Sequence, residues 1–256
     1  MKHLIGKILS GETLSEAEAG ELIEELTSEE LDPAAAGAAL AGMRTRGETA
    51  EELRAFALGL QRIAIRPEID DVSSAVDVVG TGGDSSGSLN LSTGAALLAA
   101  SAGAEVIKHG NRSVSSRSGS FDVLGALGLD VPWDATRAGE VFATTGFTYL
   151  FAPMFHPSMK SVAPVRQSLG ARTIFNLVGP LANPARTPYL VVGSFSEDSA
   201  RMMAETLSGM DIARAFVVHG EPGWDEPTPV GPYLLLDVAP GSVTETIEDP
   251  AGMGFE

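Results

Sequence analysis

The 256-residue chain contains no cysteine and has few basic or aromatic residues. It carries 17 Lys and Arg against 34 Asp and Glu, a net charge of −17, and only 6% of its residues are aromatic. The lack of cysteine excludes disulfide scaffolds, zinc–thiolate sites, iron–sulfur clusters and cysteine nucleophiles. The acidic charge argues against a duplex nucleic-acid binder, because affinity for a phosphate backbone comes from clustered Lys and Arg.

Long apolar runs are also missing. The longest uncharged stretch, residues 85–104, consists half of Ser, Thr, Asn and Gly, so it predicts a loop followed by a buried helix rather than a membrane span. Residues 1–7 have neither a sustained apolar region nor a small-residue cleavage site, which argues against a signal peptide. We therefore expect a soluble, cytoplasmic protein with no membrane partner.

The charge is distributed unevenly along the chain. Residues 1–70 hold 14 of the acids, whereas residues 100–190 hold eight basic residues against five acidic ones. Two of the four lysines, Lys108 and Lys160, lie in this middle segment. A basic segment inside an acidic chain predicts a focused anion site.

The first seventy residues predict a helical domain. Capping boxes over 15–18 and 49–52 begin two helices with apolar residues at helical spacing, and a third is expected over 33–44, with proline at its first position.

After residue 67, short β-branched runs alternate with helical patterns, which is typical of an α/β fold with a mostly parallel central sheet covered on both faces. Strands are expected over 76–79, 105–108, 148–152, 189–195 and 215–219, and helices near 93–103, 119–127, 136–144, 157–170 and 197–208. This predicts a small N-terminal helical domain (1–70), joined by helices from about 156–184, and a larger α/β domain (71–256). Ligands of such sheets bind beyond the carboxyl ends of the strands.

A glycine-rich loop follows the first expected strand. Residues 80–83 include three glycines, which let the backbone approach an anion closely and point N–H groups at it. The loop matches neither the dinucleotide fingerprint nor the P-loop, and a tight turn is the alternative. Ser92 or Thr93 is then expected to cap the next helix, whose first turn offers a second anion position; capping alone is again the alternative.

The next strand ends in a polar run over residues 108–120, which contains three cations, a His, an Asn and five serines. Such a composition at a strand end is typical of a sugar-polyphosphate site rather than of packing.

Together these motifs resemble the anthranilate phosphoribosyltransferase family. The matching segments occur in order over essentially the whole chain: 80–84, 90–93, 108–112, 115–116, 119–120, 156–160, 164–166, 172–184, 218–220 and 225–226. The resemblance implies transfer of the 5-phosphoribosyl group from phosphoribosyl pyrophosphate to the amine of anthranilate, releasing pyrophosphate, in tryptophan biosynthesis.

The resemblance also implies site residues. Phosphoribosyl pyrophosphate would be held by Gly80, Gly83, Asp84, Ser88, Asn90, Leu91, Ser92, Thr93, Lys108, His109, Gly110, Asn111, Arg112, Ser113, Val114, Ser115, Ser116 and Ser120. Anthranilate would contact Gly80, Asn111 and Arg166. Ser92, Asp225 and Glu226 would serve Mg²⁺, with two ions per site, and the helical domain would form a homodimer.

The residues themselves leave alternatives open for three of these roles. Asp225 and Glu226 suit Mg²⁺, which binds few carboxylates plus phosphate and water, or form an exposed acidic turn. Arg166 offers a planar fork for a carboxylate, or forms a surface ion pair. His109 orients the acceptor, or is a packed strand-end histidine; no general base is needed, since an aromatic amine is a neutral nucleophile at pH 7.

The chain departs from the family pattern at three places. Phe121 replaces a small residue and either crowds the phosphate loop or packs beneath it, and Gly125 stands where a Glu is expected. The resemblance also implies further helices and a strand beyond residue 256, so we expect an incomplete covering layer on the α/β domain.

Two other functions compete with this interpretation. One is a phosphoribosyltransferase or nucleoside phosphorylase with another acceptor, and the other is a non-catalytic relative with a binding role. The presence of Asp225 and Glu226 together with Lys108 and Arg166 favours an enzyme.

Overall fold

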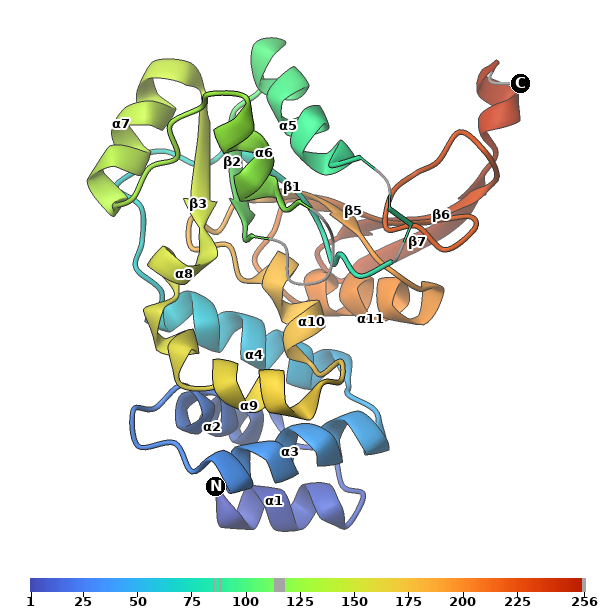
Figure 1. The fold of residues 1–256 in the computed structure, drawn as a ribbon. Coiled ribbons are helices and arrows are strands. Elements are labelled where there is room, and N and C mark those ends of the chain that lie inside the picture. Colours follow the sequence, from blue (N-terminus) through green and yellow to red (C-terminus); the bar gives the residue numbers. More distant parts are fainter. Residues whose placement is uncertain (85, 88, 113–117, 255–256) are drawn as a thin grey trace.

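The computed structural model describes residues 1–84, 86–87, 89–112 and 118–254. Its N-terminal part is a bundle of helices: α1 (Lys2–Leu9), α2 (Glu16–Leu26), α3 (Pro33–Arg46) and α4 (Ala50–Ile63) (Figure 1). Both predicted capping boxes are present, at the starts of α2 and α4. Helix α1 was not predicted; it has no side-chain N-cap, and it presents the buried residues Leu4 and Ile8 to a bundle in which it contacts α3.

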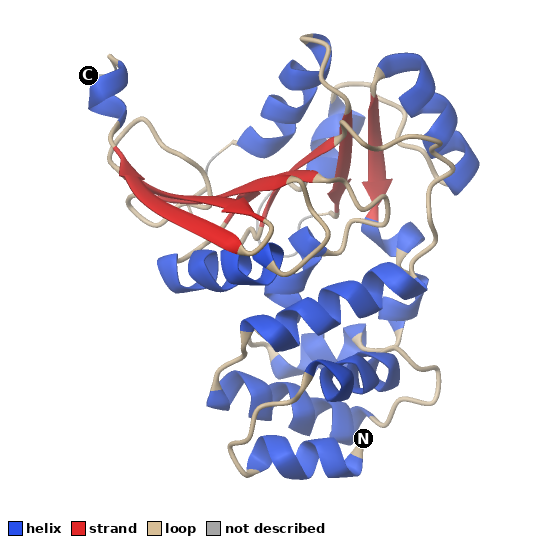
Figure 2. Ribbon diagram, turned by 180° about the vertical axis from the view of Figure 1, so that it is seen from behind, coloured by secondary structure: helices blue, strands red, loops and turns tan. Residues whose placement is uncertain are grey.

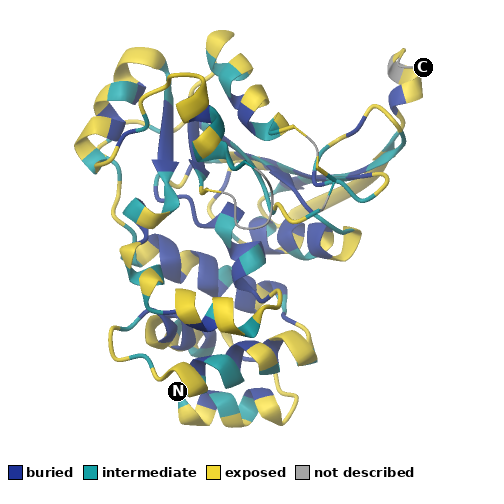
Figure 3. Cartoon of the chain, viewed as in Figure 1, coloured by how far each residue is buried: buried dark blue, intermediate teal, exposed yellow. Residues whose placement is uncertain are grey.

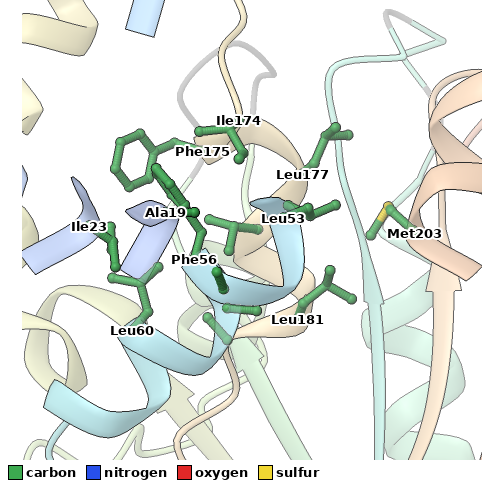
Figure 4. Packing of buried hydrophobic residues seen from close by; sticks show 14 of the residues in the cluster. Ala19, Ile23, Leu53, Phe56, Leu60, Ile174, Phe175, Leu177, Leu181 and Met203 are labelled. Carbon is green, nitrogen blue, oxygen red and sulfur yellow. The ribbon is translucent and has the colours of Figure 1, made fainter. Parts of the chain in front are cut away.

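A segment from the middle of the chain returns to this bundle. Helix α9 (Ala163–Leu169) contacts α3, and α10 (Phe175–Val178) contacts α4. The rings of Phe56 and Phe175 meet edge to face with centroids 5.8 Å apart, within the apolar cluster of Figure 4. The predicted helix over 157–170 is therefore two pieces, a 3₁₀ turn (Pro157–Lys160) and α9.

The second part is built on a seven-stranded sheet in the order β3-β2-β1-β4-β5-β6-β7. The strands are β1 (Val76–Gly80), β2 (Val106–Gly110), β3 (Phe147–Phe151), β4 (Tyr189–Gly193), β5 (Arg214–Gly220), β6 (Tyr233–Ala239) and β7 (Ser242–Glu248). The first five are parallel, as predicted, whereas β6 and β7 were not predicted and pair antiparallel at one edge. The expected α/β class with a mostly parallel sheet is confirmed.

Helices pack on this sheet unequally. The remaining helices are α5 (Leu91–Ser101), α6 (Ser120–Ala126), α7 (Ala135–Thr145), α8 (Ala152–Phe155) and α11 (Glu197–Ser208), with short 3₁₀ turns at Gly179–Leu181 and Pro250–Met253. Helix α5 contacts β1 and β2, α7 contacts β3, and α11 contacts β5 and β6. In Figures 1 and 2 no described helix lies on the face of β6 and β7 opposite α11, so this part of the sheet is not covered on both faces.

Helix α5 differs from its prediction. It was expected to be buried, but only Thr93 and Ala96 are, and Leu98 is 71% exposed (Figure 3). Among the described residues, no helix is both long enough and apolar enough to cross a bilayer.

The sheet order brings distant loops together. Strands β1 and β4 are central neighbours, with β2 and β5 beside them, and all four run in the same direction. The loops that follow Gly80, Gly110 and Gly220 therefore lie at one edge of the sheet, above the helical bundle (Figure 1).

Candidate active site

Asp225, in the loop after β5, lies against the end of β1. Its Oδ2 accepts a hydrogen bond from the backbone N–H of Gly82 at 2.7 Å. A Cβ atom on Gly80 would lie only 2.5 Å from the same oxygen, and a Cβ on Gly193 would overlap the Asp225 backbone. Glycines at the ends of two neighbouring strands therefore make the space in which this carboxylate lies.

Glu226 faces the first turn of α5. Its Oε1 accepts from the backbone N–H of Ser92 at 3.2 Å. The prediction that Ser92 or Thr93 caps this helix is wrong, because the N-cap is Asn90 and it makes no side-chain capping bond. Thr93 is instead buried, and its Oγ1 has no hydrogen-bond partner among the described residues.

Three carboxylates gather at this edge. Burial raises the pKa of Asp225, and the nearby Asp84 raises it further. Burial and the charge of Asp225 raise the pKa of Glu226 to about 7. Asp84 Oδ2 is buried without a hydrogen-bond partner in the described part of the chain. Carboxylates held together away from water are stabilised by a cation.

Lys108 is buried next to these carboxylates. Its Nζ donates to the backbone carbonyl of Val78 and lies 3.5 Å from Ser92 Oγ. Burial lowers the pKa of Lys108, and the charges of Asp77 and Glu226 oppose that shift. Asp77 is fully buried in turn, and burial raises its pKa to about 6 against the attraction of Lys108.

Two buried histidines lie side by side, one of them next to Lys108 in β2. The rings of His109 and His156 have centroids 5.2 Å apart, and both side chains are buried. Burial lowers the pKa of His109 to about 3, with His156 contributing, and burial lowers that of His156 to about 4. Both rings are therefore neutral at pH 7. His109 Nε2 and His156 Nδ1 are buried with no hydrogen-bond partner among the residues that the structure describes.

Arg166 lies on α9, in the segment that returns to the helical bundle. Its guanidinium lies 5.0 Å from the ring centroid of Phe175. Burial lowers its pKa, and no described carboxylate lies within ion-pair distance of it. The surface ion-pair alternative therefore has no support in the described residues, whereas a partly buried, unpaired guanidinium suits a ligand carboxylate.

Known proteins match this chain over its whole length. Residues 2–64 match the helical bundle domain of a glycosyl transferase family, and residues 72–256 match that family's a/b domain. The anthranilate phosphoribosyltransferase of Pelotomaculum thermopropionicum is 44% identical over 255 residues, which cover 100% of this chain and 74% of that protein. The chain belongs to the anthranilate phosphoribosyltransferase family.

Solved structures of the family have the same fold. The Thermus thermophilus anthranilate phosphoribosyltransferase is 42% identical with a TM-score of 0.91, covering 99% of this chain and 75% of that chain. The Saccharomyces cerevisiae enzyme, solved in complex with PRPP (phosphoribosyl pyrophosphate) and Mg, is 25% identical with a TM-score of 0.85, covering 98% and 73%.

The structure places most of the residues predicted from the family resemblance at one edge of the sheet. Gly80 ends β1 and Gly83 follows it, Lys108 to Arg112 lie at the end of β2, and Asn90 to Thr93 begin α5. Asn90 Nδ2 donates to the Ser118 carbonyl at 3.2 Å, and Ser120 Oγ donates to the Asn111 carbonyl at 3.2 Å. The predictions for Ser88, Ser113, Val114, Ser115 and Ser116 lie outside the described residues.

Two residues that sequence analysis did not assign to the site belong to its surroundings. Arg172 donates to the Gly83 carbonyl, and its guanidinium lies 3.8 Å from the Phe195 ring centroid. Asp77 accepts from the His109 N–H at 3.2 Å and from Asn183 Nδ2 at 2.8 Å. An Asp within an apolar strand was the available signal for Asp77, since buried carboxylates are rare unless paired.

Phe121 packs against aromatic residues of β3. Its ring lies against Phe151, with centroids 4.4 Å apart and planes at 35°, and against Tyr149 at 6.4 Å. Gly125 is exposed, and a Cβ atom there would meet nothing within 4 Å.

Proposed function

We propose that this protein transfers the 5-phosphoribosyl group from phosphoribosyl pyrophosphate to the amine of anthranilate. The observation that carries the proposal is the edge of the sheet where the glycine-rich loop and the first turn of α5 meet Asp225 and Glu226. Arg166 of α9, which has no ion-pair partner among the described residues, is the proposed partner of the acceptor carboxylate. Phosphate-binding backbone, metal-binding carboxylates and a carboxylate-binding arginine are the groups that this reaction requires.

The carboxylates fit Mg²⁺. The described residues include no group of three or more His, Asp and Glu placed to hold a metal unaided. Magnesium typically takes one or two carboxylates and completes its shell with substrate phosphates and water. Asp225 and Glu226, with Asp84 and Ser92 beside them, would hold it, and when bound it would neutralise charge on the departing pyrophosphate. Two ions per site are part of this proposal.

The reaction breaks the bond between the anomeric carbon and a pyrophosphate oxygen, whose electrons leave with pyrophosphate. The amine lone pair forms the new carbon–nitrogen bond, and the nitrogen then releases one proton to water. The chain's own contribution is to bind and orient: the loop after β1 and Lys108 to Arg112 hold the phosphorylated ribose, and Arg166 with Asn111 and Gly80 holds the acceptor.

His109 has no acid–base role in this proposal. Burial lowers its pKa to about 3, so it is neutral at pH 7. Its buried Nε2 has no partner among the described residues and accepts a hydrogen bond in the tautomer that carries the proton on Nδ1. An acceptor at this position suits orientation of an amine N–H, while Arg166 fixes the carboxylate of the same molecule.

The decisive experiment follows the fluorescence of anthranilate with phosphoribosyl pyrophosphate and Mg²⁺. Loss of fluorescence that stops when Mg²⁺ is chelated supports the proposal. If the folded protein leaves anthranilate unchanged but cleaves nucleosides with phosphate, the proposal is wrong and a nucleoside phosphorylase is the better interpretation.

Replacement of Arg166 tests the acceptor site separately. Arg166→Ala is expected to raise the KM for anthranilate far more than that for phosphoribosyl pyrophosphate, because it removes the carboxylate partner. Arg137→Ala, which removes an exposed arginine paired with Glu140, is the matched control. An equal rise of both KM values in Arg166→Ala would refute the acceptor assignment.

We also propose that the helical domain comprises residues 1–70 together with helices from about 156–184, leaving 71–256 as the α/β domain. Contacts of α9 with α3 and of α10 with α4 support this division. Dimerisation through the helical domain and a cytoplasmic location stay predictions; sedimentation of the full chain tests the first.

A further inference from the structure

Arg112 lies on a platform of two aromatic rings at the edge of the proposed site. Its guanidinium carbon is 4.6 Å from the ring centroid of Phe121 and 5.8 Å from that of Phe151. The two rings pack on each other with centroids 4.4 Å apart. Phe151 ends β3, opposite Gly110 in the sheet register, so this ring comes from the strand next to β2, whose last residue precedes Arg112 by two positions; Phe121 comes from α6.

Hydrogen bonds from Ser120 hold the start of α6 in place. Ser120 Oγ lies 2.7 Å from Tyr149 Oη and donates to the Asn111 carbonyl at 3.2 Å. The start of α6 is thereby tied both to β3 and to the residue before Arg112. Phe121, the second residue of α6, is held where its ring can meet the guanidinium.

The Arg112 side chain has no carboxylate partner in the part of the chain that the structure describes, and the residue is exposed. A free arginine side chain samples many rotamers, and binding an anion restricts them. A guanidinium that stacks by its face on aromatic rings keeps its edge N–H groups available for phosphate oxygens. The platform therefore orders Arg112 before the ligand arrives, which lowers the entropic cost of binding.

We propose that Phe121 is a positioning residue that holds Arg112 ready for the phosphate groups of phosphoribosyl pyrophosphate, with Phe151 as its support. The inference rests on the proposed function and deepens it, because it assigns to Phe121 a part in binding the phosphoribosyl donor. Phe121 acts through Arg112 and does not itself touch the substrate.

The test is a double-mutant cycle read by calorimetric titration with phosphoribosyl pyrophosphate and Mg²⁺. Phe121→Leu keeps an apolar side chain but removes the ring, and it is expected to raise the Kd about three- to ten-fold, between the values for an exposed and a desolvated cation–π contact. In an Arg112→Gln background the same substitution is expected to change the Kd less than about two-fold, because the partner is already absent. The kcat and the KM for anthranilate should stay within about two-fold of the parent, since affinity for the donor is what changes.

Two further variants separate positioning from folding. Phe121→Tyr keeps the ring and is expected to retain the parent Kd, even if Phe121→Leu lowers the melting temperature. Phe216→Leu is the matched control, because Arg214 lies 5.0 Å from that ring at the opposite end of the parallel strands.

The outcomes are distinct. An unchanged Kd in Phe121→Leu, or the same factor with and without Arg112, would overturn the inference and leave Phe121 a packing residue only. If the parent protein itself binds no phosphoribosyl pyrophosphate, the proposed function fails instead.

Discussion

Gly80→Ala should impair the use of Mg²⁺. The new Cβ would lie 2.5 Å from Asp225 Oδ2, whereas ordinary contacts begin at 3.4 Å, so the carboxylate must move by roughly 0.9 Å. Metal–ligand distances tolerate only about 0.2 Å. The same movement breaks the 2.7 Å bond from the Gly82 N–H to that oxygen. Asp225 would therefore leave its binding position.

The expected loss in Mg²⁺ binding free energy is that of one charge-assisted contact, about 1.5–3 kcal/mol. This corresponds to a rise of about ten- to hundred-fold in the Mg²⁺ concentration that gives half-maximal activity. The assay is the initial rate of anthranilate fluorescence loss against Mg²⁺ at saturating substrates, with the melting temperature measured in parallel. High Mg²⁺ should restore much of the rate.

Gly94→Ala is the control. Gly94 lies in the first turns of α5, a Cβ there would meet nothing within 4 Å, and alanine is the better helix former. A folded Gly80→Ala protein with the parent's Mg²⁺ dependence would refute the reasoning, as would an equal rise in Gly94→Ala.

Three more outcomes are expected. Burial and Asp225 raise the pKa of Glu226 to about 7, so protons compete with Mg²⁺ below that pH, and the half-saturating Mg²⁺ concentration should rise about ten-fold from pH 8 to pH 6. Glu226→Gln should abolish this pH dependence, and its persistence in the variant would contradict the assignment of Glu226 to Mg²⁺. Glu52→Ala should lower the free energy of unfolding by about 3–5 kcal/mol in urea titration, because Arg46 lies 2.5 Å from this fully buried carboxylate and would lose its partner. As the control, Glu51→Ala at the neighbouring exposed position should lower the free energy of unfolding by less than about 0.5 kcal/mol. Phe56→Ala should cost about 3–5 kcal/mol, since the ring is fully buried (Figure 4), and a loss under 1 kcal/mol would mean that the bundle repacks around it.

The elements with local signals were predictable. The capping boxes at the starts of α2 and α4 satisfy backbone groups within four residues, so they are visible in sequence and present in the structure. The five parallel strands likewise stand out as short, mostly apolar runs, four of which end in glycine. Strand β6, in contrast, begins with four apolar residues in succession, which periodicity alone cannot distinguish from a helix, and the exposed β7 is defined by its pairing with β6.

The sequence by itself determined the chemical types in the candidate site: glycines after a strand, a Lys–His–Gly–Asn–Arg run, an acidic pair and an arginine on a helix. Only the tertiary structure decided which of them meet. Asp225 bonds to a residue 143 positions away and Glu226 to one 134 positions away, and Arg172 bonds to the glycine loop across 89 positions. Such contacts depend on strand order and on the space that two glycines leave at adjacent strand ends, which no local pattern specifies. The aromatic platform under Arg112 has the same origin, because β2 and β3 become neighbours only when the sheet forms.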